Sequence, residues 1–200
     1  MRSTGIKAIE THYNGYRFRS RLEARWAVYF DALGIEYEYE PEGFVLPGGA
    51  SYLPDFYLPI VDAYVEIKSR HSTEINAASD KLFDVAEQTG KYGLFCTGDP
   101  VDNNMKLCGM FILNDCKGMM WKPTEFIIGA EEISDDFAGY HKVFEVGLVI
   151  NDTRIADVKK FNGERIRTVI PRIRLFGYER LPYEEQERAR QARFEHGECG

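Results

Sequence analysis

The stretch SYLPDFYLPIVDAYVEIK, residues 51–68, predicts two extended segments joined by a turn. Residues 63–68 are mostly apolar and β-prone, which indicates a strand, and the proline and aspartate of residues 59–62 favour the turn. Side chains alternate between the two faces of a strand, so Glu66 and Lys68 should share one face. Val65 and Ile67 should then point to the other face, into a core.

Taken singly, the polar residues of this stretch have ordinary explanations. Pro54-Asp55 is a common turn pair, and a glutamate beside a lysine is typical of a surface ion pair. A hairpin that carries Asp55 on one strand and Glu66 and Lys68 on the next brings two carboxylates and an amine together. Two hard oxygen donors suit Mg²⁺. The lysine could orient an attacking water, stabilise charge on phosphorus, or act as a base if its pKa were lowered.

The elements around this hairpin predict a mixed sheet flanked by helices. Residues 20–33 carry apolar side chains at helical spacing between a Ser20 N-cap and Gly34. Residues 35–40 alternate as a strand with a solvated acidic face. A second helix is predicted from residue 72 or 73 to 89, followed by a strand at residues 92–96. The order of helix, three strands, helix and strand indicates an α/β or α+β sandwich.

The second half of the chain has a weaker pattern. We predict strands at residues 105–113, 144–150 and 166–176, the last broken at Pro171, and a charged helix at residues 183–195. The chain is therefore divided into a core, residues 1–100, and a β-rich and helical C-terminal extension, residues 101–200. The sequence leaves open whether the extension is continuous with the core.

The motif Pro54-Asp55 followed by Glu66-Ile67-Lys68 resembles the P-D…(D/E)-x-K motif of the restriction-endonuclease-like nucleases, the PD-(D/E)XK superfamily. The element order through residue 97 resembles the αβββαβ core of that family. The resemblance implies a metal-dependent endonuclease that hydrolyses DNA phosphodiester bonds. It implies that Asp55, Glu66 and the Ile67 backbone carbonyl hold Mg²⁺, for which Mn²⁺ can substitute, and that Lys68 is catalytic.

Within this superfamily the first helix often supplies a further acid, and Glu23 occupies the matching position. The resemblance therefore implies a catalytic role for Glu23 in binding metal or water. The alternative is structural, because Ser20-x-x-Glu23 is also a capping box. The spacing of the motif residues is similar to that of phage endonucleases that resolve Holliday junctions. Residues 13–26 are similar to uncharacterised phage and bacterial nuclease-like proteins, which implies a phage or mobile-element origin and names no substrate. The junction-resolving enzymes make selectivity for junction or branched DNA one alternative, and paired nicks across a symmetric junction would need two active sites, as in a homodimer.

The net charge of −7 is unevenly distributed. Residues 1–25 carry six Arg and Lys against two acids, net +4, and residues 163–193 carry net +3. Basic ends around an acidic middle fit a protein that contacts DNA phosphates and holds a divalent metal. An ordinary solvated helix surface explains the basic residues equally well. The candidate phosphate contacts are Arg17, Arg19, Arg21 and Arg25.

Several function classes are disfavoured. The chain has no signal-peptide pattern and no apolar run long enough to cross a bilayer, so we expect a soluble cytoplasmic protein. Its four cysteines form no disulfide framework, and it has neither a Gly-x-Ser-x-Gly elbow nor a phosphate-binding Gly-x-x-x-x-Gly-Lys loop. The remaining alternative to an endonuclease is a non-catalytic accessory factor that binds nucleic acid or protein on a nuclease-like scaffold.

Overall fold

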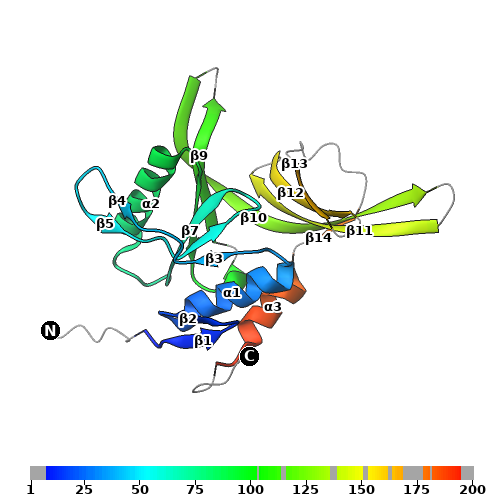
Figure 1. The fold of residues 1–200 in the computed structure, drawn as a ribbon, viewed down its shortest axis with the longest axis horizontal. Coiled ribbons are helices and arrows are strands. Elements are labelled where there is room, and N and C mark those ends of the chain that lie inside the picture. The colour runs from blue at the N-terminus through cyan, green and yellow to red at the C-terminus, as the bar shows by residue number, and fades with distance from the viewer. Residues whose placement is uncertain are drawn as a thin grey trace.

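The chain folds into a mixed β-sheet with helices on both faces (Figure 1). A computed structural model describes residues 8–102, 104–113, 116–135, 139–150, 153–161, 164–168, 178–180 and 182–194. The helices are α1 (Arg21–Leu33), α2 (Ile75–Thr89) and α3 (Tyr183–Gln191), with a 3₁₀ turn η1 (Pro100–Asp102). The strands are β1 (Thr11–Tyr13), β2 (Tyr16–Phe18), β3 (Glu38–Tyr39), β4 (Phe44–Val45), β5 (Ser51–Tyr52), β6 (Phe56–Leu58), β7 (Ala63–Lys68), β8 (Tyr92–Thr97), β9 (Met105–Leu113), β10 (Cys116–Asp135), β11 (Gly139–Ile150), β12 (Thr153–Phe161), β13 (Glu164–Thr168) and β14 (Tyr178–Arg180).

The main sheet has ten strands within the described ranges, in the order β13-β12-β11-β10-β9-β8-β7-β6-β3, with β14 beside β10. β6 and β7 pair antiparallel, whereas β7 and β8 pair in parallel because α2 connects them. The members of this sheet and the helices up to residue 97 follow the predicted order of helix, three strands, helix and strand. β4 and β5 form a separate pair, as do β1 and β2.

Helix α1 begins and ends where its sequence predicts. The Ser20 hydroxyl accepts a hydrogen bond from the Glu23 amide, and Gly34 adopts the left-handed conformation at φ 69°. The buried stripe of α1, which includes Trp26 and Phe30, covers the apolar side chains of β6, β7 and β8 on one face of the sheet. This packing forms the larger of the two hydrophobic cores.

Helix α2 covers the opposite face of the sheet. Its buried residues Ala78, Leu82 and Val85 pack against Tyr64 of β7 and Phe95 of β8. The helix starts at Ile75, later than predicted, because residues 71–74 form a turn. The two helices thus bury alternate residues of the same strands, and the polar residues of β7 lie on the α2 side with Tyr64.

The predicted strand at residues 35–40 is mostly wrong. Only Glu38 and Tyr39 pair with β6, because the Ile35 amide still bonds back to the Phe30 carbonyl of α1 at 2.8 Å. Glu40 ends the pairing with a positive φ of 47°. Residues 51–58, predicted as one extended stretch, are divided between β5 and β6.

The sheet continues across residue 100, because β9 pairs antiparallel with β8. Strand β9 has its predicted bounds. The twenty-residue β10 was not predicted; its first half pairs with β9 and its second half with β11. The predicted strand at 144–150 is part of β11. Of the strand predicted at residues 166–176, residues 166–168 lie in β13, and residues 169–177 lie outside the described residues.

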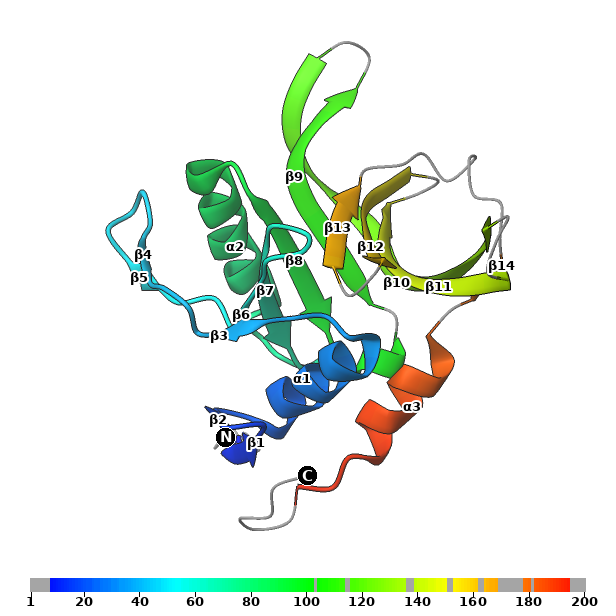
Figure 2. The same cartoon turned by 45° about the vertical axis from the view of Figure 1, so that its right-hand side comes forward.

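Helix α3 returns to the core and lies beside α1 in both views (Figure 2). Ala189 and Phe194 are buried in the same core as α1. The helix ends at Gln191 rather than at the predicted residue 195. None of the helices in the described ranges is long and apolar enough to cross a membrane.

Substitution of Gly109 in β9 tests how closely β9 packs against Tyr92 of β8. A Cβ at this position would lie 2.3 Å from the ring of Tyr92, so Gly109→Ala should destabilise the protein by about 1–3 kcal/mol through overpacking. Urea unfolding followed by circular dichroism measures this change. Gly118→Ala in the paired strand β10 is the control, because its Cβ would meet no atom within 4 Å. Equal stability of the two variants would contradict the predicted clash.

Candidate active site

Asp55 lies at the start of β6, beside the strand that carries the rest of the motif. The β6–β7 register pairs Phe56 with Val65, and extending it by one position sets Asp55 opposite Glu66. The Asp55 Oδ2 atom accepts a hydrogen bond from the Ile67 backbone amide at 2.7 Å. Asp55 is 2% exposed and Glu66 is 3% exposed. The structure thus brings the two predicted carboxylates together in a buried setting.

Glu66 and Lys68 share one face of β7, as the alternation of side chains predicts. The Lys68 ammonium contacts Glu66 Oε1 directly, while the Tyr52 hydroxyl donates to Glu66 Oε2 at 2.7 Å. Both oxygens of Glu66 therefore have a donor. Lys68 remains the partly exposed member of the group, at the boundary between the buried carboxylates and solvent.

Glu23 and Ser20 cap α1 together, but the Glu23 carboxylate bonds to the Arg19 amide rather than to the Ser20 amide that a capping box uses. Its Oε1 accepts from the Ser20 hydroxyl at 2.8 Å, and its Oε2 accepts from the Arg19 amide and the Tyr39 hydroxyl. Its carboxylate nevertheless acts electrostatically on Asp55. Glu23 is therefore a structural cap whose negative charge faces the site, and a role in binding metal or water stays a prediction.

Arg19 supplies a half-exposed cation at the edge of these carboxylates. Its Nη2 lies 2.7 Å from Asp55 Oδ1, and its Nε lies 2.7 Å from Glu40 Oε1. The prediction assigned Arg19 to DNA phosphate, whereas here its guanidinium neutralises two acids of the same chain. Arg19 precedes the N-cap of α1, so the cap that starts the helix also positions this guanidinium.

The other three arginines are also engaged within the chain. Arg17 pairs with Glu10 on the exposed face of the β1–β2 hairpin. Arg25 lies 2.8 Å from Asp99, and Arg21 donates to the Phe194 carbonyl at 3.4 Å. These contacts leave phosphate binding by Arg17, Arg21 and Arg25 as a prediction.

Burial and like charge set the protonation of the group. The pKa of Asp55 is raised well above its ordinary value by burial first, then by the carboxylates of Glu66 and Glu23. Lys68 and the Ile67 amide oppose this rise without cancelling it. Burial lowers the pKa of Lys68, but Glu66 and Asp55 raise it more, so its pKa lies above the ordinary value. Lys68 is therefore an ammonium at neutral pH, which favours charge stabilisation over the role of a base.

The donor chemistry of the group fits a hard divalent cation. Asp55 and Glu66 offer carboxylate oxygens, and their mutual repulsion in a buried setting would be relieved by added positive charge. Among the described residues, no group of three or more His, Cys, Asp and Glu side chains is arranged to hold a metal ion. The predicted set of Asp55, Glu66 and the Ile67 carbonyl has only two such side chains, so water and substrate oxygens would complete the coordination of Mg²⁺.

Three residues of the site were not predicted from the sequence. Tyr52 and Tyr39 each donate a hydroxyl to a site carboxylate, and Glu40 pairs with Arg19. Tyr39 could have been found from the sequence. Tyrosines alternate with glutamates in residues 35–40, which indicates that the tyrosines face the protein interior. Tyr52 gave no such signal, since its contact depends on how residues 40–52 loop past β7.

Comparison with known proteins adds no relative. No protein-family model matches the chain, and no curated protein matches its sequence.

The cysteines add no second candidate site within the described side chains. Cys96 and Cys108 are buried free thiols, and the pKa of Cys96 is raised by burial. The side chains of Cys116 and Cys199 lie outside the described residues.

The raised pKa of Asp55 gives a pH-dependent stability. Because the folded-state pKa exceeds the unfolded one, its favourable contribution is full at low pH and is lost as pH rises through the folded value. Asp55→Asn removes this loss, so the variant should gain stability relative to wild type between about pH 4 and neutral pH. Urea unfolding in EDTA at both pH values measures it. A difference in unfolding free energy between Asp55→Asn and wild type that is the same at both pH values would contradict the raised pKa of Asp55. So would an equal pH-dependent gain in the exposed Glu38→Gln variant.

Arg19→Met removes the cation beside Asp55 while keeping an unbranched side chain. Without metal, the variant should lose about 1–3 kcal/mol, between the values for exposed and buried ion pairs. Added Mn²⁺ should then raise its melting temperature more than that of wild type.

Arg17→Met is the matched control, because its ion pair is exposed and outside the site. Thermal melts with and without Mn²⁺ compare the three proteins. An identical response to Mn²⁺ in all three would exclude competition between Arg19 and a divalent cation.

Proposed function

We propose that this protein is a metal-dependent endonuclease of the PD-(D/E)XK type that hydrolyses phosphodiester bonds of DNA. One observation carries the proposal: Asp55, Glu66 and Lys68 meet in a buried, charge-dense group at the junction of β6 and β7. Neighbouring buried carboxylates repel one another and are costly to fold, and groups whose pKa is shifted by burial and charge cluster at functional sites. The mixed α/β fold, with α1 and α2 on opposite faces of the sheet, is compatible with the αβββαβ core of that superfamily.

Each motif residue has its own proposed role in the reaction. Asp55 and Glu66, with the Ile67 carbonyl, would hold Mg²⁺ or Mn²⁺, and the Tyr52 hydroxyl orients Glu66. The partly exposed Lys68 ammonium faces solvent beside Glu66, where it can orient water and stabilise negative charge on a phosphate. Glu23 keeps the N-terminus of α1, and with it Arg19, at the edge of the group.

The reaction is a displacement at phosphorus. The oxygen of a water molecule forms a bond to phosphorus, and the bond from phosphorus to the 3′ oxygen breaks. The attacking water loses a proton to bulk solvent, and the departing 3′ oxygen takes one up from solvent. The products are a 5′-phosphate and a 3′-hydroxyl. When bound, the divalent cation lowers the pKa of water and polarises the phosphate. Lys68 stays protonated throughout, in agreement with its raised pKa.

Asp55→Asn and Lys68→Met should each lower the rate of DNA cleavage by at least about 100-fold, since each removes a charge that acts on the transition state. The assay incubates labelled four-way junction, nicked, linear and single-stranded DNA with Mg²⁺, Mn²⁺ or EDTA. Wild-type protein should cut at least one of these substrates with either cation and none in EDTA.

Glu38→Gln and Lys81→Met are the matched controls, because they change the same charges at exposed positions outside the site. Circular dichroism checks that every variant is folded. Cleavage by Asp55→Asn and Lys68→Met at the wild-type rate would reject the site. DNA binding without any cleavage by wild-type protein would favour the non-catalytic accessory factor.

A further inference from the structure

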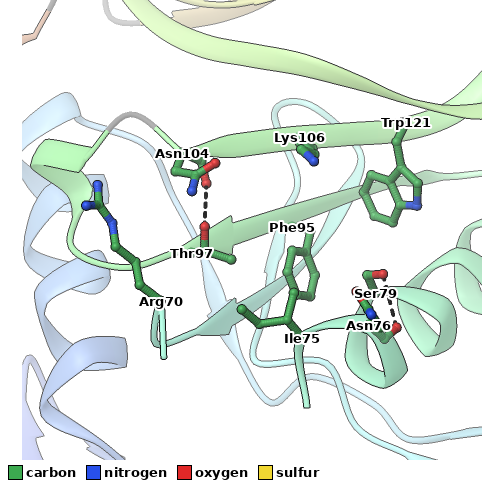
Figure 3. Close-up of a pocket in the computed structure, with 9 residues that line it drawn as sticks. All are labelled: Arg70, Ile75, Asn76, Ser79, Phe95, Thr97, Asn104, Lys106 and Trp121. Atoms are coloured by element: carbon green, nitrogen blue, oxygen red, sulfur yellow. Dashed lines mark hydrogen bonds between the residues drawn. The ribbon is translucent and has the colours of Figure 1, made fainter. Parts of the chain in front are cut away.

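A cavity lies beside the candidate active site, on the α2 side of the sheet (Figure 3). Its volume is about 650 Å³, within the roughly 300–1,000 Å³ typical of ligand pockets. In Figure 3, Arg70 lies at one end of the lining and Trp121 at the other, with Phe95 and Lys106 between them. The first turn of α2 forms one wall. The proposed chemistry uses none of these residues.

The strand register connects this cavity to the site. Glu66 of β7 is paired with Phe95 of β8, which is paired in turn with Lys106 of β9. Paired residues point to the same face, so Glu66, Phe95 and Lys106 form a row across the sheet. Two strand spacings of about 4.8 Å separate Lys106 from Glu66. A ligand held in the cavity would therefore reach the candidate active site without crossing the sheet.

The lining combines an aromatic surface with positive charge. Trp121 is partly exposed and packs edge-on against Phe95, with ring centroids 6.1 Å apart. Arg70 and Lys106 are exposed cations, and none of the described lining side chains is acidic. Arg70 also lies 2.9 Å from Asp102, which offsets part of its charge, whereas Lys106 has no acidic residue beside it in the described cavity lining.

The N-terminus of α2 adds to the positive electrostatic potential of the cavity. Ile75 and Asn76 line the cavity, and no side-chain hydrogen bond caps this end of the fifteen-residue helix. Helix N-termini carry partial positive charge and favour anions. Lysine, arginine and the helix end together therefore favour a phosphate, while Trp121 offers a planar apolar face to a ring.

We propose that this cavity binds an unpaired nucleotide of a DNA strand, with its base against Trp121 and its phosphate near Lys106 and Arg70. This assignment rests on the proposed endonuclease function and narrows its substrate class to DNA with single-stranded segments. Bases within an intact duplex are stacked on their neighbours and cannot present a face to a tryptophan. A concave aromatic pocket with a cationic rim therefore selects single strands, flaps or junctions over linear duplex.

Binding of fluorescein-labelled oligothymidylate, followed by fluorescence anisotropy in EDTA, tests this assignment without cleavage. Trp121→Leu should weaken binding by about 5- to 100-fold, the range for loss of one stacked base. Lys106→Met should weaken it several-fold and lower the salt dependence by about one phosphate contact. Lys106 is exposed, so its variant keeps the test valid if Trp121→Leu fails to fold.

The matched controls are Tyr183→Leu and Lys81→Met, an exposed aromatic residue and an exposed lysine outside the cavity. Both should bind as wild type does, and unlabelled linear duplex should compete poorly. Wild-type affinity in Trp121→Leu and Lys106→Met, or equal competition by duplex, would overturn the assignment.

The two proposals fail in different ways. Trp121-dependent binding without any cleavage in Mg²⁺ would support the cavity and reject the endonuclease. Cleavage that requires Asp55 and Lys68 but treats duplex and single strands alike, in wild type and in Trp121→Leu, would support the endonuclease and reject the cavity. Each result therefore decides one proposal independently of the other.

Discussion

The antiparallel pairing of β6 with β7 places Asp55 beside Glu66 and Lys68 in the candidate site. Val65 and Ile67 fill the core beneath α1, so a slip of one residue would turn them to the α2 face and turn the ammonium of Lys68 into that core. The hydrogen bond from the Ile67 amide to the Asp55 carboxylate fixes the start of β6 in the same register. Core packing on one face therefore determines the chemistry available on the other.

This register concentrates negative charge where water is largely excluded. Asp55 and Glu66 are almost fully buried, and Glu23 adds a third carboxylate to the field that acts on Asp55. Arg19 and Lys68 compensate part of this charge, and the hydroxyl of Tyr52 satisfies the second oxygen of Glu66. Removing charged groups from water is unfavourable even when they are paired. The divalent cation that we propose for this group would offset that cost and account for carboxylates, rather than apolar residues, at these positions.

Local patterns predicted α1, β7 and β9 well and the short strands β3, β5 and β6 and the long β10 poorly. The caps of α1 and the bounds of β7 and β9 follow from short-range signals in the sequence. The β1–β2 hairpin was missed, although Asn14-Gly15, with positive φ at both residues, is a strong hairpin signal. The length of β10 carried no such signal, because its two halves are stabilised by different partner strands.

The sequence by itself determined that Glu66 and Lys68 share a face and that Ser20 and Glu23 cap a helix, because both depend only on the period of one element. Only the tertiary structure decided that Arg19 lies against Asp55, thirty-six residues away, and that Tyr52 supports Glu66. The tertiary structure also decided that Trp121 and Lys106 border a cavity beside the candidate active site. Such contacts depend on strand order and register across the sheet, which no local pattern encodes.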